Sequence, residues 1–169
     1  VLRYSQNMDF TNVLLNEIKR FYPQEYNIGL YAIKIMKEKL GISLPKDEAA
    51  SIALHIFNAE YEIGVSDAFH ATQLIDNILK IINDKFQCKD DDYYYERFVT
   101  HLKYLAQRII KNEHLPVKEK GFYKILINSY PNEMKCIENI SEYVLKTYGY
   151  KMSYEEIASI TIHIKKISY

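Results

Sequence analysis

Hydrophobic residues recur at intervals of three and four along nearly the whole chain, which is the spacing of one face of an α-helix. One clear case runs through Leu74, Ile75, Ile78, Ile81 and Ile82. Long runs that alternate hydrophobic and polar residues, as half-buried β-strands do, are absent from the sequence. The pattern predicts an all-α protein with helices near residues 9–20, 23–40, 46–61, 68–86, 92–112, 117–128, 131–148 and 154–167.

Residues that favour helix ends flank these segments. Pro23 and Pro131 stand where the first turn of a helix tolerates a missing N–H. Gly41 and Gly149 follow the last periodic residue of their segments, as glycines in the left-handed conformation do after a helix. Further caps are predicted at Ser66 or Asp67, and at Ser153 with Glu156 as a capping box.

The same markers occur twice, always 108 positions apart. Tyr22-Pro23-x-Glu25 matches Tyr130-Pro131-x-Glu133, and the pairs Gly41 and Gly149, Glu48 and Glu156, and His55 and His163 keep this offset without a gap. Duplication of one helical domain explains such a match better than chance. We therefore expect two tandem helical-bundle domains, a first at 1–63 and a complete second at 64–169. Because the chain opens on Val1 within the first copy, we expect a fragment whose first domain is incomplete at its N-terminus.

The repeated histidine lies on a partly polar helix face. Each of His55 and His163 follows a serine by four residues and a glutamate by seven, which places the three side chains on one face. For a single histidine on an apolar helix, a hydrogen-bonded interior residue is the better interpretation. The duplication alone shows that both copies inherited the histidine, and it does not show that the histidine has a function.

A third histidine lies between two arginines. His101 follows Arg97 by one turn and precedes Arg108 by two turns on the same helix face. Two guanidinium groups would disfavour protonation of the imidazole, yet would stabilise a dianionic phosphate attached to it. Ordinary surface arginines on an exposed helix are the alternative. His70 and His114 are expected to be surface residues.

Composition excludes several classes of function. Lys plus Arg equals Asp plus Glu at 22 each, so the formal charge is zero and direct nucleic-acid binding by this chain is not supported. The two cysteines, Cys88 and Cys136, fit no metal spacing and suit a reducing cytoplasm. No apolar run of about 20 residues predicts a membrane span. We expect no cofactor and no metal.

Three segments resemble the tandem PTS regulation domains (PRD) of the BglG/LicT/SacY family of transcriptional antiterminators. They are LPKDEAASIALHIFNAE at 44–60, RFVTHLKYLAQR at 97–108 and EEIASITIHIKKI at 155–167, and the resemblance spans essentially the whole chain. It implies compact bundles of five helices that form homodimers. It also implies histidines that accept phosphate from the sugar phosphotransferase system.

The resemblance assigns roles position by position. His101 and His163 fall on the first and second phosphorylatable histidines of the second domain, and His55 falls on the second such histidine of the first domain. The remaining histidine is expected upstream of Val1, as is the small module through which family members bind RNA. Ala50 and Ser51 depart from the family, which often has glycine and an aromatic residue there.

The sequence therefore predicts the regulatory region of a sugar-responsive antiterminator rather than an enzyme. By resemblance, the phosphocarrier HPr phosphorylates His101 and His163, the IIB domain of a sugar-specific permease phosphorylates His55, and phosphorylation shifts dimerisation. Arg97 and Arg108 would hold the phosphate on His101.

Three alternatives stay open at this point. The chain can be a fragment of a PRD-containing transcriptional activator or a purely structural dimerisation module. A metal-dependent enzyme built on a helical bundle is the third. Such an enzyme requires Glu-x-x-His pairs, and neither His55 nor His163 has a glutamate three residues before it.

Overall fold

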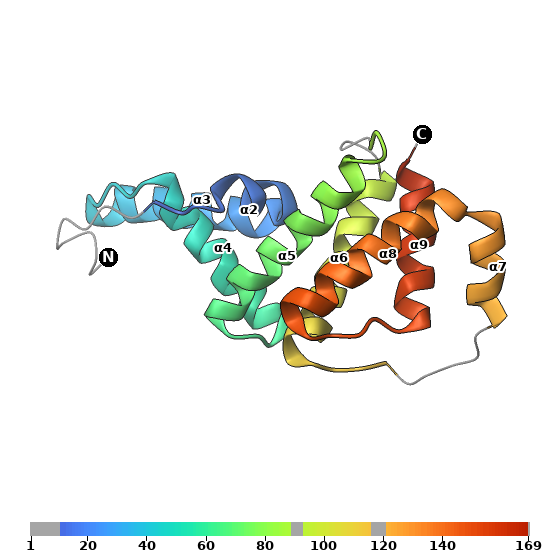
Figure 1. Cartoon of the computed structure of the whole chain (residues 1–169). Helices are drawn as coiled ribbons and strands as arrows, with labels where there is room; N and C mark the ends of the chain where they lie inside the picture. The colour runs from blue at the N-terminus through green and yellow to red at the C-terminus, as the bar shows by residue number, and fades with distance from the viewer. Residues whose placement is uncertain (1–10, 89–92, 116–120, 169) are drawn as a thin grey trace. The chain divides into compact units, whose positions relative to one another are not determined.

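The computed structural model describes residues 11–88, 93–115 and 121–168. Within these ranges the chain is all-α, as predicted, and contains no strand (Figure 1). Its helices are α2 (Leu15–Phe21), α3 (Pro23–Leu40), α4 (Lys46–Tyr61), α5 (Val65–Asn83), α6 (Tyr93–Lys111), α7 (Gly121–Ser129), α8 (Pro131–Tyr148) and α9 (Tyr154–Ile167).

Four helices, α3, α4, α8 and α9, have the predicted bounds, and strong end signals explain this for α3, α8 and α9. Pro23 and Pro131 occupy the first turns of α3 and α8. Gly41 and Gly149 follow these helices with φ values of 68° and 66°, a conformation that glycine adopts without the steric penalty of a Cβ. At α9 the predicted capping box is present: the Ser153 hydroxyl accepts from the Glu156 backbone N–H, and the Glu156 carboxylate accepts from the Ser153 N–H.

The prediction of a first helix over residues 9–20 was wrong at its start. In the described part, α2 begins only at Leu15, because Asn12 forms a turn before it. The Asn12 Oδ1 atom accepts from the Leu14 N–H at 3.0 Å, and the Asn12 N–H donates to Asp47 Oδ1 at 2.7 Å. Such local side-chain bonds compete with helix formation.

The predicted helix over 68–86 lies three residues earlier, at Val65–Asn83. Asp67 lies inside its first turn and accepts from the Gly64 N–H at 3.2 Å. Residues 84–86 form a turn instead of a last helical turn. The sequence KDDD at 89–92 is typical of a solvated helix entry and lies outside the described residues.

The chain divides into two compact units, Val1–Gln73 and Leu74–Tyr169. In the first unit, α3 and α4 cross closely at Gly29, where an added Cβ would lie 2.3 Å from the carbonyl oxygen of Ala49. Tyr22 is fully buried beside Phe57, and its hydroxyl lies 3.0 Å from the Thr72 hydroxyl. Gly29 on α3 and Ala49 on α4 therefore allow the two helices to pack closely. The aromatic rings of Tyr22 and Phe57 fill the space beside them.

The second unit has a core of hydrophobic residues from four helices. Its fully buried members include Leu74, Ile75, Phe98, Leu102, Ile137, Ile140, Val144 and Ile164. Helix α9 packs against α6, α7 and α8. This packing places the polar edges of α6 and α9 next to each other, and the candidate site lies there.

Candidate functional site

Helices α6 and α9 bring two of the predicted histidines into contact. The ring centroids of His101 and His163 lie 4.3 Å apart, with the planes tilted by 43°. His163 also stacks on the buried Phe98 ring at 5.4 Å and 20°. His101 is exposed, whereas His163 is half-buried. The exposed ring is therefore the accessible member of the pair.

The surroundings of both imidazoles favour the neutral form. Burial lowers the pKa of His163 to about 4, with smaller contributions from the nearby charges of His101, Lys166 and Arg97. Burial also lowers the pKa of His101, followed by the effects of Arg97 and Arg108. A neutral imidazole carries a nitrogen lone pair that can act as a nucleophile. The expected effect of the two arginines on His101 is thus confirmed in direction.

The two arginines contact different partners. Arg97 Nη1 donates to the Tyr93 hydroxyl at 3.1 Å, and its guanidinium lies 5.6 Å from the centre of that ring. Arg108 Nε donates to Glu156 Oε1 at 3.0 Å. Of the two, Arg108 shares a pocket with His101.

A small open pocket lies between α6 and α9. It has a volume of about 50 Å³ and is lined by His101, Tyr104, Leu105, Arg108, Glu156, Ser159 and Ile160. At roughly 10–15 Å³ for each water-sized group, it has room for about three to five such groups. The pocket therefore suits a small anion or a phosphoryl group rather than a metabolite.

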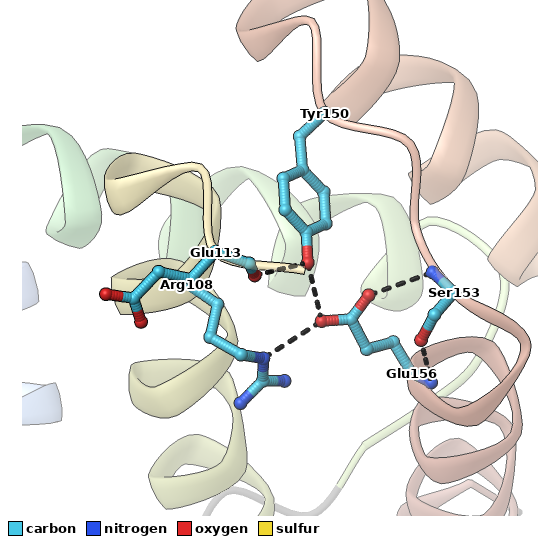
Figure 2. Close-up of polar contacts among 5 residues, drawn as sticks. All are labelled: Arg108, Glu113, Tyr150, Ser153 and Glu156. Atoms are coloured by element: carbon cyan, nitrogen blue, oxygen red, sulfur yellow. Dashed lines mark hydrogen bonds and ion pairs between the residues drawn. The ribbon is translucent and has the colours of Figure 1, made fainter. Parts of the chain in front are cut away.

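Sequence reasoning missed the polar network behind this pocket. The Tyr150 hydroxyl donates at 3.0 Å to Glu156 Oε1, and Glu113 O lies 3.1 Å from the same hydroxyl (Figure 2). The sequence placed Glu156 in the capping box and on the helix face of His163, and neither position predicted these contacts. Its distance of 48 positions from Arg108 left no sequence signal for their ion pair.

The remaining histidines are placed differently. His55 is exposed on α4, and no other histidine contacts it in the described part of its unit. His70 is exposed on α5. His114 is exposed after α6, but its ring stacks on Tyr150 at 4.5 Å with an angle of 7°. The structure thus pairs His101 with His163 within the second unit.

The described residues contain no group of three or more His, Cys, Asp or Glu side chains arranged to hold a metal ion. Among the helices in the described ranges, none combines the length and the apolar character needed to cross a membrane.

These features define a class of protein: a chain of repeated helical domains in which the second copy presents a histidine pair beside an arginine-lined pocket. Comparison with known families gives the class its name. The model of the PRD domain matches residues 1–59 and 72–167, and the chain belongs to this family. The resemblance drawn from the sequence motifs is confirmed, and the family model matches two separate segments of the chain.

Individual relatives agree with this assignment. The transcription antiterminator LicT of Bacillus subtilis is 34% identical over 169 residues, which cover 99% of this chain and 61% of the relative. The beta-glucoside operon antiterminator of Dickeya chrysanthemi is 34% identical over 98% of this chain and 59% of its own length. The PtsGHI operon antiterminator of Bacillus subtilis is 29% identical, with 99% and 60% covered. The chain therefore spans about three fifths of the length of these relatives.

Proposed function

We propose that this chain is the regulatory region of a sugar-responsive transcriptional antiterminator, controlled by phosphorylation of His55, His101 and His163. The observation that carries the proposal is the contact between His101 and His163 beside Arg108. Three relatives that align over nearly the whole chain are named as antiterminators. The chain itself acts as a switch with no reaction of its own.

The proposed chemistry needs a neutral nucleophile. An imidazole nitrogen attacks the phosphorus of a phosphohistidine or phosphocysteine donor, the new N–P bond forms, and the donor's N–P or S–P bond breaks. The proton of the accepting ring passes to the departing group. The lowered pKa values of His101 and His163 favour this step at neutral pH.

The proposed donors are the phosphocarrier HPr for His101 and His163 and the IIB domain of a sugar-specific permease for His55. Each phosphate adds a charge of about −1.5 to −2. Arg108 and Arg97 would stabilise that charge on His101. On α4, Glu48 precedes His55 by seven residues, so a phosphate there would meet a like charge.

We further propose two PRD domains at 1–63 and 64–169, a homodimer, and a cytoplasmic location. A two-fold interface turns one charge change into two equivalent effects. Cys88 and Cys136 are thiols rather than a disulfide, which suits a reducing compartment. RNA binding is assigned to a separate module and not to this chain, whose formal charge is zero.

Phosphorylation by purified components tests the proposal. The chain is incubated with phosphoenolpyruvate, enzyme I and HPr, and acid-labile phosphate is mapped by mass spectrometry at alkaline pH. We expect phosphate on His101 and His163, lost at each site in the His101→Gln or His163→Gln variant. His70→Gln is the matched control at an exposed histidine and should change nothing. No phosphate on either residue would favour the purely structural dimerisation module.

Sedimentation tests the effect on association. His101→Asp with His163→Asp, a weak mimic of the phosphorylated second domain, should tighten dimerisation, whereas His55→Asp should loosen it. If the double variant dissociates more readily than the parent, the activating role assigned to the second domain is wrong. An unchanged His55→Asp variant would remove the inhibitory role assigned to His55 in this chain.

A further inference from the structure

Glu156 is a buried carboxylate in the wall of the pocket that contains His101. Its side chain is 1% exposed, whereas that of Arg108 is 25% exposed. Three donors reach it: Arg108 Nε at 3.0 Å and the Tyr150 hydroxyl at 3.0 Å on Oε1, and the Ser153 N–H at 2.9 Å on Oε2 (Figure 2). Arg108 is thus held through one edge of its guanidinium by a fixed anion.

A buried carboxylate is tolerated only when donors or an opposite charge compensate its lost hydration. Glu156 has both kinds of compensation. The attraction is mutual, because the carboxylate also neutralises the charge of Arg108. Any second anion in the pocket must therefore share this guanidinium with Glu156 and accept repulsion from the carboxylate.

The repeat offers an internal comparison. Glu48 occupies the equivalent position on α4, but Ile42 stands in place of Tyr150 and Pro45 in place of Ser153. The N-cap of α4 makes no side-chain hydrogen bond, unlike that of α9. A helix at this position of the repeat therefore starts without hydrogen bonds like those that surround Glu156. In the second copy, the three donors around Glu156 lie beside the histidine pair.

We propose that Glu156 is a positioning residue that sets how strongly Arg108 holds a phosphoryl group on His101. This inference rests on the proposed phosphorylation of His101. Glu156 orients the guanidinium toward the pocket and at the same time weakens its pull on the phosphoryl oxygens. Phosphate on His101 is consequently stabilised by Arg108 but stays easy to remove, as a reversible signal requires.

Chemical phosphorylation tests this without a protein donor. Phosphoramidate transfers its phosphoryl group to an imidazole: the P–N bond of the reagent breaks, ammonia leaves, and a P–N bond to the ring forms. In a His163→Gln background, the lifetime of phosphate on His101 is followed by phosphorus NMR and site-resolved mass spectrometry at about pH 7. A phosphorylated ring loses its phosphate fastest when its second nitrogen is protonated, so a less neutralised Arg108 prolongs the lifetime.

We expect Glu156→Gln to lengthen the lifetime by roughly threefold or more, which corresponds to a fall of about half a unit in the pKa of the phosphorylated ring. Arg108→Gln should shorten it. In the double variant, Glu156→Gln should have no effect beyond that of Arg108→Gln, because Glu156 acts through Arg108. Glu48→Gln, the equivalent change in the first unit, should leave the lifetime unchanged.

Tyr150→Phe provides a second variant that preserves every charge. It removes one donor to Glu156 Oε1 and leaves the carboxylate more dependent on Arg108, so the lifetime on His101 should shorten. An unchanged or shorter lifetime in a folded Glu156→Gln protein would overturn the inference, as would a longer lifetime in Tyr150→Phe. HPr can fail to phosphorylate the chain while the phosphoramidate experiments give the expected lifetimes. In that case the proposed donor is wrong and the role of Glu156 stands.

Discussion

His163 should make the folded protein less stable as the pH falls from about 6.5 toward about 4. Burial, His101, Lys166 and Arg97 together lower the pKa of His163 from 6.5 to about 4. Between these values the unfolded chain binds a proton on this ring that the folded chain does not. Stability therefore rises with pH across this window, and the loss is complete only below the folded-state pKa.

The size of the effect follows from the shift and the exposure of the ring. Each pKa unit corresponds to about 1.4 kcal/mol, so the full shift sets an upper bound of about 3 kcal/mol. Because His163 is only half-buried, solvent screening reduces this to roughly 1–2 kcal/mol. About 1 kcal/mol of that loss should have accumulated by about pH 5, above the range in which most carboxylates titrate.

Urea unfolding at about pH 7.5, 6.5, 5.5 and 5 measures this contribution. The parent should lose about 1 kcal/mol more than His163→Gln between the two extremes. His70→Gln removes an exposed histidine and should keep the parental slope. If the parent and His163→Gln have the same slope, the His163 ring titrates normally in the folded protein and the argument for a neutral nucleophile at this position fails.

Three further changes test the packing and the caps by urea unfolding at neutral pH. Ser153→Ala removes the N-cap acceptor of α9 and should lower the free energy of unfolding by about 1 kcal/mol; an unchanged midpoint would show that the cap contributes nothing. Gly29→Ala would place a Cβ 2.3 Å from a backbone oxygen of α4 and should cost about 2 kcal/mol or more, so a stabilised variant would contradict the close crossing. Tyr22→Phe removes the buried contact with Thr72 and should cost about 1 kcal/mol, unless that hydroxyl pair is not formed.

Local chemistry explains why much of the fold was predictable. Hydrophobic spacing marks a helix whatever it packs against, and Gly41 and Gly149 end their helices because a left-handed residue is easiest for glycine. Boundaries failed where side chains bond outside the helical pattern. Asn12 and Asp67 each accept a nearby backbone N–H, and a propensity argument cannot say which of several such residues takes the cap.

The site was predictable only in part, because sequence spacing specifies neighbours within one helix. Arg97 and Arg108 could be placed near His101 from their positions on α6. The contact between His101 and His163, 62 positions apart, depends on how α6 packs against α9. The same holds for Glu156 and Tyr150, whose link to Arg108 arises from the turn between α8 and α9.

The two copies of the repeat show how an inherited residue can acquire different surroundings. His163 contacts the rings of Phe98 and His101, and burial is the largest cause of its lowered pKa. His55, at the equivalent position, is exposed on α4. Under the proposed phosphorylation, a dianion on His163 must displace or reorient packed rings, whereas a dianion on His55 faces the Glu48 carboxylate on its own helix face. Because the energetic consequences differ, one chemical modification can give opposite effects in the two domains without any difference in the modified residue itself.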